Sequence, residues 1–275
     1  MVTLPSIAIL GTGSMGGAIL AGLTAPSVSV DGRIRVTNRT VEKARPLSSA
    51  AVESFALAET PDANRLAVAG ARVVLIGVKP AMVTDLLREI ADALEPDAIV
   101  ISVAAGVTTA TMEAIVPGVV LRAMPNTPAV VGRGVTGIAP GSRTSAAEIQ
   151  LARALFETVG TVLDIPESKI DALSTISGSG PAYVFYLIEE LTRTAIDLGF
   201  TAEESETMVN GTFLGAAELL VSSGAEPAEL RRRVTSPHGT TERAIEVLQS
   251  ADLKELFDRA TAAALARARE LAAGA

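Results

Sequence analysis

The sequence of 275 residues contains no cysteine, no tryptophan and a single histidine, His238. The missing cysteines exclude disulfide bonds, thiolate metal sites and a cysteine nucleophile, and one histidine is too few for a histidine-rich zinc site. We therefore expect no metal site. Aromatic residues make up only 3% of the chain and hydrophobic residues 48%, so the core must be built from Ala, Val, Leu and Ile.

Long hydrophobic runs and clustered positive charge are also missing. No apolar stretch reaches the roughly 18 to 20 residues that cross a bilayer, and the N-terminal segment carries no basic region. The net charge is −8 and Lys and Arg form no stripe, which argues against nucleic acid as the main partner. We expect a soluble, cytoplasmic protein with no nucleic-acid or membrane partner, in which local groups hold any anionic ligand.

The first part of the chain alternates short β-branched runs with helical patterns, which indicates βαβ units and a parallel sheet. The predicted strands span 6–10, 33–37, 72–77, 98–102, 119–123, 135–139 and 161–165. The helices between them span 14–23, 41–50, 63–69, 82–94, 109–115 and 144–159, the last opening on a Thr or Ser N-cap.

From about residue 168 only helical patterns remain, at 170–175, 180–198, 202–222, 227–234, 240–249 and 253–273. We therefore expect an α/β fold, with a Rossmann-type, doubly wound and mostly parallel sheet in residues 1–166 and an all-α domain in residues 167–275. The helix that begins near Pro181 is apolar nearly all round. A solvated surface helix does not carry that pattern, so we expect it to be covered in an oligomer.

A glycine-rich segment, residues 11–16, follows a predicted strand and opens a predicted helix, as a dinucleotide-binding fingerprint requires. Gly11 permits the tight turn, Gly13 lets the backbone approach a pyrophosphate, and Gly16 allows the helix to pack closely on the strand. A glycine turn without a ligand is the weaker alternative. The predicted cofactor contacts in this loop are Gly11, Thr12, Gly13, Ser14, Met15 and Gly16.

The end of the next predicted strand carries Asn38, Arg39 and Thr40. An NAD-specific fold usually places an acid here for the ribose 2′-hydroxyl, and no acid is present. The donors and the cation suit a 2′-phosphate, so we expect these three residues to bind NADPH, with NADH as a weaker cofactor. A solvated surface arginine is the alternative.

Three further segments follow predicted strands. Val78, Lys79 and Pro80, and then Ala104, Ala105 and Gly106, fall where a doubly wound sheet opens its ligand crevice, and we expect both to line the cofactor. Simple strand termination explains them equally well. Asn126 stands between two prolines and can hydrogen-bond an amide or a ribose, which favours a nicotinamide-side contact over a merely rigid loop.

Two segments in the helical part are rich in glycine and hydroxyl groups. Ser177, Ser179 and Gly180 precede Pro181 and suit a pocket wall, although helix capping explains much of the pattern. Residues 234–242 form a hydroxyl-rich loop that runs into a helix N-terminus, a setting that binds carboxylates without an arginine. Thr240 acting only as an N-cap is the alternative. His238 in this loop is expected to face solvent.

Taken together and in this order, these segments resemble the pyrroline-5-carboxylate reductase family over essentially the whole chain. The most specific are Ser-Gly-Ser-Gly-Pro-Ala-Tyr at 177–183 and Thr-Ser-Pro-His-Gly-Thr-Thr at 235–241. Residues 104–106 and 124–128 agree with the family, and Asn64 matches a family position at the adenosine side. His238 departs from it, because many members carry glycine there.

The resemblance implies hydride transfer from NADPH to the ring C=N of 1-pyrroline-5-carboxylate, which gives proline. It implies that Thr241 hydrogen-bonds the ring nitrogen, and that Ser236 and the N–H groups around Gly239 and Thr240 hold the carboxylate. It also implies a helical dimerisation domain that interlocks with a second chain, active sites shared between the two chains of a homodimer, and larger rings of dimers.

Two other functions fit parts of the sequence. A 3-hydroxyacid dehydrogenase of related fold needs a catalytic lysine in its helical half, where only Lys169 and Lys254 occur, neither in a glycine-rich helical motif. A catalytically silent NADP-binding regulatory protein would bind NADPH without turnover. The intact hydroxyl loop at residues 236–241 argues against it.

Overall fold

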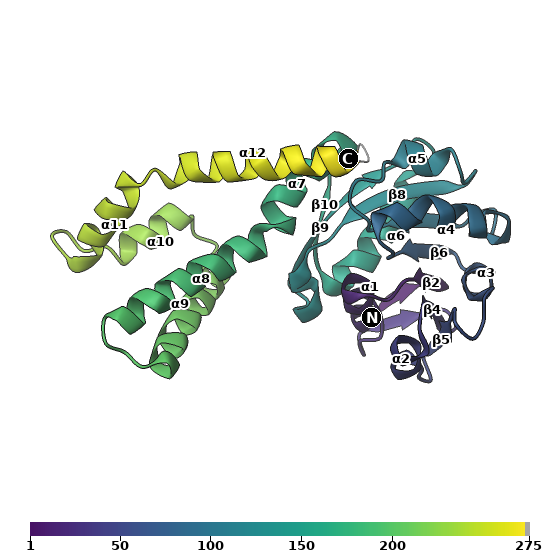
Figure 1. Cartoon of the computed structure of the whole chain (residues 1–275), viewed down its shortest axis with the longest axis horizontal. Coiled ribbons are helices and arrows are strands. Elements are labelled where there is room, and N and C mark those ends of the chain that lie inside the picture. The colour runs from purple at the N-terminus through teal and green to yellow at the C-terminus, as the bar shows by residue number, and fades with distance from the viewer. Residues whose placement is uncertain (273–275) are drawn as a thin grey trace. The chain divides into compact units, whose positions relative to one another are not determined.

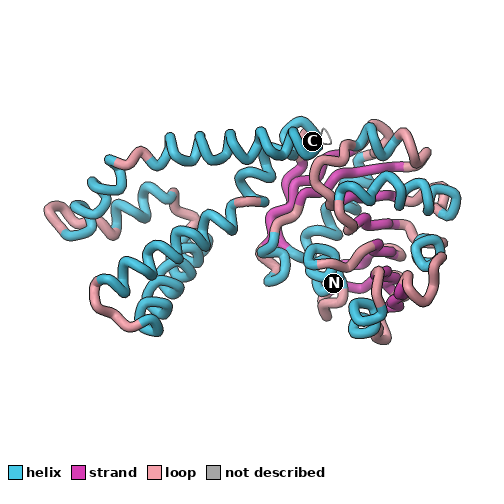
Figure 2. The backbone as a smooth tube through the Cα atoms, in the orientation of Figure 1, coloured by secondary structure: helices cyan, strands magenta, loops and turns pink. Residues whose placement is uncertain are grey.

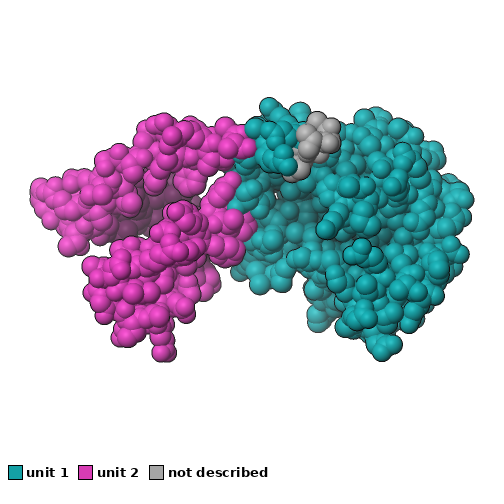
Figure 3. Space-filling view, in the orientation of Figure 1, with its two compact units in different colours: residues 1–179, 264–275 teal, residues 180–263 magenta. Residues whose placement is uncertain are grey.

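The structure is a computed structural model that describes the backbone of residues 1–272 and the side chains of residues 1–270. The end of the predicted helix 253–273, and of the predicted domain 167–275, lies outside the described residues. The chain forms two compact units, one of Met1–Ser179 with Ala264–Ala275 and one of Gly180–Ala263 (Figure 3). Each unit is described by itself below.

An eight-stranded sheet forms the centre of the first unit (Figure 1). Its strands, in spatial order, are β10 (Gly160–Asp164), β9 (Gly134–Pro140), β8 (Val119–Met124), β7 (Ile99–Ser102), β6 (Val73–Ile76), β2 (Ile7–Leu10), β4 (Ile34–Asn38) and β5 (Val52–Ala56). All neighbours are parallel except β8 and β9. From β5 to β8 the chain order is that of a Rossmann sheet, which confirms the predicted fold class. Two short strands, β1 (Val2–Leu4) and β3 (Val28–Val30), pair separately.

Helices cover both faces of this sheet and leave an aliphatic core on each side. Leu and Ile side chains of α1 (Ser14–Leu23) and Leu and Phe side chains of α6 (Ala146–Phe156) pack on one face. On the other face lie α3 (Ala63–Val68), α4 (Val83–Ile90) and α5 (Thr109–Glu113). Ser145 and Glu148 form a capping box that begins α6, which confirms the predicted Ser or Thr N-cap.

All seven predicted strands are present, but the prediction missed β5 and the two short strands β1 and β3. The predicted helix 41–50 was wrong in its second half. The α-helix α2 ends at Ala44 and continues as a single 3-10 turn, η1 (Arg45–Leu47), because Pro46 supplies no N–H and cannot continue an α-helix. The chain then reaches β5, in which Glu53 and Ser54 stand side by side and interrupt the alternation of apolar and polar residues that indicates a strand.

Short helical turns connect several strands and place the loops discussed below. They are η2 (Pro80–Met82), η3 (Ala91–Ala93), η4 (Thr127–Val131), η5 (Glu157–Val159) and η6 (Glu167–Lys169). After β10 the described chain consists of helices and the loops that join them, with no further strand (Figure 2). It starts with α7 (Ile170–Leu173), which passes into a π-helical turn, η7 (Ser174–Gly178).

The spatial division of the chain falls later than the predicted boundary at residue 166, because residues 167–179 pack on the sheet. Ile170 and Thr175 are buried in the first unit, 1% and 4% exposed. A side chain at Gly137 of β9 would collide with Leu173, which shows how closely α7 approaches the strand. The first unit therefore includes the start of the helical region.

The second unit consists of helices. They are α8 (Gly180–Asp197), α9 (Ala202–Ser223), α10 (Pro227–Arg233), α11 (Thr240–Ser250) and the first part of α12 (Leu253–Ala272). Helices α8 and α9 form an antiparallel hairpin, and a capping box of Thr201 and Glu204 begins α9. Large apolar side chains of α8 are 45% to 66% exposed in the single chain: Val184, Phe185, Tyr186, Leu187 and Leu191. This much apolar surface, exposed in the single chain, indicates an interaction surface.

No helix in the described part of the chain is both long enough and apolar enough to span a membrane.

Candidate active site

Three glycines shape the loop between β2 and α1, and they differ in how much space a side chain would have at each position. Gly11 has φ +89°, and a Cβ there would lie 2.9 Å from Cγ1 of Val78. A Cβ on Gly16 would lie 2.6 Å from the Gly11 carbonyl oxygen. Gly13, in contrast, has no atom within 4 Å of the place where a Cβ would stand, so its backbone is open to an incoming group. This is the division of roles expected for a dinucleotide-binding turn.

The start of α1 presents free backbone donors beside that open glycine. Gly13 is the N-cap, it supplies no side-chain acceptor, and the first turn contains no acidic residue. The first N–H groups of a helix have no partner within the helix, and the helix dipole adds positive potential at this end. The loop is therefore suited to bind a pyrophosphate.

The end of β4 anchors the glycine loop. The Thr37 carbonyl accepts hydrogen bonds from the N–H groups of Gly11 at 3.1 Å and Thr12 at 3.3 Å, and the Asn38 amide donates to the Thr12 hydroxyl. The Thr37 hydroxyl donates to Asn64 at 2.8 Å, and Asn64 donates to Glu89 at 3.0 Å. Asn38 and Asn64 are both buried. The Asn38 amide contacts the glycine loop directly, and Asn64 contacts Thr37, whose carbonyl binds that loop. A direct cofactor contact by either amide stays a prediction.

The other predicted cofactor residues of this region, Arg39, Thr40 and Lys79, are not buried as the two asparagines are. Arg39 and Lys79 are exposed, and among the described residues neither has an ion-pair partner. The Thr40 hydroxyl donates to Glu42, and the pKa of the Glu42 carboxyl lies below its ordinary value because of its own backbone N–H and this hydroxyl. Two free cations therefore stand at the edge where β4 and β6 end, which suits anionic groups.

The remaining predicted cofactor residues lie at the same edge. Leu10 pairs with Ile76, and Ile76 pairs with Ser102, so the loops after β2, β6 and β7 start side by side. Val78 packs against Gly11, and Pro80 opens η2. After β7, the Ser102 hydroxyl accepts the Ala104 N–H at 3.2 Å, Ala105 is exposed, and Gly106 has φ +75°. The structure thus brings the predicted cofactor residues from residue 11 to residue 106 together.

Asn126 lies beyond β8 and is tied to the chain at both ends of its amide. Its Nδ2 donates to the Ser177 carbonyl at 2.9 Å, and its Oδ1 accepts the Val135 N–H at 2.8 Å. Ser177 belongs to the π-turn and Ser179 is the residue that follows it, where the Ser179 N–H donates to the Ser174 carbonyl at 2.8 Å. Only one Nδ2 hydrogen of Asn126 remains for a ligand. The observed contacts of Asn126 join parts of the chain, and the nicotinamide contact stays a prediction.

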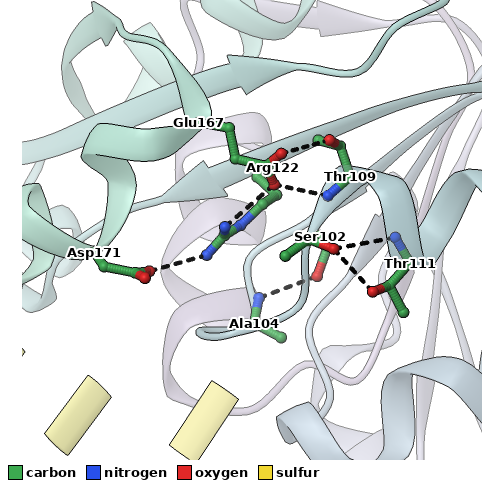
Figure 4. A network of polar contacts seen from close by, with 8 residues as sticks. Ser102, Ala104, Thr109, Thr111, Arg122, Glu167 and Asp171 are labelled. Atoms are coloured by element: carbon green, nitrogen blue, oxygen red, sulfur yellow. Dashed lines mark hydrogen bonds and ion pairs between the residues drawn. The ribbon is translucent and has the colours of Figure 1, made fainter. Parts of the chain in front are cut away.

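The prediction did not assign a role to Arg122, which forms the most buried charge cluster of the first unit. Its side chain is 5% exposed and pairs with Glu167 at 3.2 Å and Asp171 at 3.4 Å (Figure 4). Glu167 also accepts hydrogen bonds from the Thr109 N–H at 2.7 Å and hydroxyl at 2.6 Å. An arginine inside the apolar run of β8 signals such a cluster, since a buried charge requires partners.

The hydroxyl loop at residues 235–241 belongs to the second unit, and Gly180 opens α8 of the same unit. The Gly239 N–H donates to the Ser236 carbonyl at 3.0 Å, and the Thr235 hydroxyl donates to the Arg231 carbonyl at 2.6 Å. Gly239, not Thr240, is the N-cap of α11, and it supplies no side-chain cap. The alternative in which Thr240 serves only as the N-cap is therefore wrong. The first N–H groups of α11 stay available to an anion.

Within this loop Ser236 and Thr240 are exposed and Thr241 is half-buried, so hydroxyls and helix N–H groups occur together. Among the candidate substrate residues, Ser177 and Ser179 fall in the first unit, and Gly180, Ser236, Gly239, Thr240 and Thr241 in the second.

His238 occupies a backbone conformation that favours glycine. Its φ is +62°, and its N–H donates to the Glu242 carboxylate at 2.8 Å. We expect His238→Gly to raise the free energy of unfolding by about 0.5 kcal/mol, since relief of the left-handed strain slightly exceeds the entropy that glycine adds to the unfolded chain. Thermal unfolding at fixed protein concentration measures this gain. His238→Ala keeps the strained φ without the imidazole, so an equal gain from alanine would contradict the backbone explanation.

Comparison with known proteins shows what this combination is similar to. Residues 167–271 match the family described as "Pyrroline-5-carboxylate reductase dimerisation", and residues 6–106 match "NADP oxidoreductase coenzyme F420-dependent". A pyrroline-5-carboxylate reductase of Pseudomonas aeruginosa is 39% identical over 271 residues, which cover 98% of this chain and 97% of that protein. The chain belongs to the pyrroline-5-carboxylate reductase family.

Solved structures agree with this membership. A pyrroline-5-carboxylate reductase from Coxiella burnetii has a TM-score of 0.88 and 37% identity, covering 97% of this chain and 98% of that one. A Plasmodium falciparum pyrroline carboxylate reductase, solved with NADP bound, has the same fold at 23% identity with a TM-score of 0.81, covering 97% of this chain and 98% of that one. The family assignment predicted from residues 177–183 and 235–241 is therefore confirmed.

Family membership also weighs against the dehydrogenase alternative. Lys169 is exposed in η6, and Lys254 is exposed and pairs with Asp258 on the next turn of α12. Neither lysine is buried in a pocket, as a catalytic lysine usually is.

Proposed function

We propose that this chain reduces 1-pyrroline-5-carboxylate to L-proline with NADPH. The observation that carries the proposal is the near-full-length similarity to pyrroline-5-carboxylate reductases. This similarity includes the helical unit and the sheet edge formed by residues 11–16, 38–40, 78–80 and 104–106, which we call the nucleotide edge. In the balanced reaction a hydride from NADPH forms a C–H bond at the imine carbon and a proton forms an N–H bond, so the ring C=N becomes a C–N single bond and NADP⁺ remains. NADPH supplies the hydride, and the residues of this chain orient the two reactants.

The nucleotide edge fits the proposed cofactor. The open backbone at Gly13 and the uncapped start of α1 accept the pyrophosphate, while Gly11 and Gly16 keep the turn tight. Arg39 is the exposed cation for the 2′-phosphate, and residues 6–106 match a family of NADP oxidoreductases. NADH lacks this phosphate, so it binds more weakly.

Arg39→Ala tests the preference for NADPH. We expect KM for NADPH to rise about 10-fold and KM for NADH to change less than about 2-fold, because an exposed charge-assisted hydrogen bond to phosphate is lost. Initial rates with each cofactor at saturating substrate give both constants. Lys43→Ala, which removes a neighbouring exposed cation of α2, serves as the matched control. Equal increases for both cofactors would assign Arg39 to a group other than the 2′-phosphate.

The substrate end is supplied by the loop before α11. The carboxylate of the substrate lies at the helix N-terminus, held by the Ser236 hydroxyl and the N–H groups near Gly239 and Thr240. The Thr241 hydroxyl hydrogen-bonds the ring nitrogen. Because no strong acid is needed to reduce an iminium, orientation accounts for most of the rate enhancement.

The family match to a dimerisation domain indicates a homo-oligomer. The finer arrangement is part of the proposal: two chains cover the exposed apolar face of α8, one chain supplies the nucleotide edge and its partner supplies the Ser236–Thr241 loop, and dimers assemble into rings. The exposed face of α8 supports this because so much apolar surface is rarely left in water. A cytoplasmic location stays a prediction.

The deciding experiment is NADPH oxidation followed at 340 nm with purified protein and 1-pyrroline-5-carboxylate. Turnover that is faster with NADPH than with NADH supports the proposal. Tight NADPH binding without turnover would instead favour the silent NADP-binding protein. Reduction of NADP⁺ by a 3-hydroxyacid, with no turnover of 1-pyrroline-5-carboxylate, would favour the related dehydrogenase.

A further inference from the structure

A buried amide in the first unit connects the nucleotide-binding sheet to the segment that carries two of the candidate substrate serines. Asn126 is 7% exposed and lies just after β8, and Pro125 and Pro128 restrict the backbone on either side. Its two hydrogen bonds, to Ser177 and Val135, fix the side chain in one orientation.

The Ser177 carbonyl has a specific need for this donor. In an α-helix it would accept from the N–H four residues later, but that residue is Pro181, which has no N–H. The π-turn of residues 174–178 widens the backbone at this point, and π-turns of this kind occur often at functional sites. Asn126 supplies the donor at 2.9 Å from a different part of the chain.

The same strand holds the segment at its other end. Arg122 lies in β8 and pairs with Glu167 and Asp171, which precede the π-turn. Residues 167–177 are therefore fixed at two points, by the ion pairs with Arg122 in β8 and by the hydrogen bond from Asn126 just after β8. Within this unit, the position of Ser177 and Ser179 is determined by the sheet whose edge carries the nucleotide loops.

We propose that Asn126 is a positioning residue for hydride transfer: through the Ser177 carbonyl it sets the place of Ser177 and Ser179 relative to the nucleotide edge. This role rests on the proposed function and differs from the direct cofactor contact predicted from the sequence. It requires the Nδ2 donor, whereas a contact with the nicotinamide would affect cofactor binding first.

The test compares Asn126→Asp, which keeps the size and the acceptor but replaces the donor by oxygen, with Asn126→Ala, which adds no buried charge. Both variants are expected to lose about 10²-fold in kcat/KM for 1-pyrroline-5-carboxylate, as a reactant misplaced by about 1 Å does. The primary isotope effect with 4-deuterated NADPH rises, because hydride transfer becomes slower. The Kd of NADPH without substrate stays within about 2-fold, since no phosphate contact changes.

Thr144→Ala is the matched control, because the Thr144 hydroxyl donates to the Val120 carbonyl at 3.0 Å near the other end of β8. It should leave kcat/KM and the isotope effect unchanged. Asn126 variants that behave like Thr144→Ala would overturn the proposal in favour of a purely structural bond, and a large loss in NADPH affinity would overturn it in favour of a direct cofactor contact.

Hydrogen exchange of residues 174–179 provides a readout that does not depend on turnover. Faster exchange in both Asn126 variants but not in Thr144→Ala supports the proposal that Asn126 holds these residues in place. Unchanged exchange overturns it. If the wild-type protein shows no turnover, the proposed function fails, while this measurement still decides whether Asn126 holds residues 174–179 in place.

Discussion

Replacing Thr241 by alanine should lower kcat/KM for 1-pyrroline-5-carboxylate by about 10²-fold, the effect of removing one hydrogen-bond donor aimed at a reacting atom. Thr241 occupies the second position of α11 and is half-buried, in the first turn of the helix whose free N–H groups are proposed to receive the carboxylate. The loss should fall mainly on kcat, since the backbone donors remain and continue to bind the carboxylate.

Thr241→Ser is the control for this prediction, because it keeps the hydroxyl and removes only a methyl group. Steady-state rates of both variants with saturating NADPH separate kcat from KM. We expect the serine variant to stay within about 10-fold of the wild type, since the donor is retained but less restricted in rotation. An alanine variant within threefold of the wild type would show that the ring nitrogen is held by another group or by water.

The glycine turn between β2 and α1 was the local geometry that the sequence predicted best. Gly11, Gly13 and Gly16 have roles fixed by steric geometry, so their spacing after a strand predicts the turn, the open backbone and the close packing that the structure shows. The predicted helix at residues 14–23 agrees with α1 for the same reason. Local patterns of this kind need no knowledge of distant partners.

The parts that were missed depend on contacts distant in sequence. Asn126 looked like a ligand contact because its two partners, Ser177 and Val135, are not visible in the local sequence. Arg122 was left without a role for the same reason, since Glu167 and Asp171 follow it by more than forty positions. Strand β5, at one edge of the sheet, was missed because its sequence lacks a clear alternation of apolar and polar residues.

The loop before α11 shows the opposite case, in which the chemistry was predicted but the local geometry was not. Thr240 was considered as an N-cap, whereas Gly239 holds that position and leaves both threonines inside the first helical turn. A glycine N-cap provides no side-chain acceptor, so more N–H groups remain for an external anion. The correction therefore agrees with the carboxylate site proposed for this loop.

Arg122→Met should lower the free energy of unfolding by about 3 kcal/mol, the usual cost of removing one partner from a buried ion pair. The methionine fills much of the same volume, but Glu167 and Asp171 lose their cation in a site where Arg122 is only 5% exposed. Because both carboxylates are about one third exposed or less, water recovers part of their solvation, which places the loss at the lower end of the range.

Urea unfolding at a fixed protein concentration measures this loss, since oligomer stability depends on concentration. Arg88→Met is the matched control: its pair with Asp85 is 2.8 Å long but 65% and 82% exposed, and we expect a change below about 0.5 kcal/mol. Adding Glu167→Gln and Asp171→Asn to Arg122→Met removes the uncompensated charges and should restore part of the stability. A loss no larger than that of Arg88→Met would mean that the cluster does not hold residues 167–171 on the sheet, and the fixed position of the π-turn would then depend on Asn126 alone.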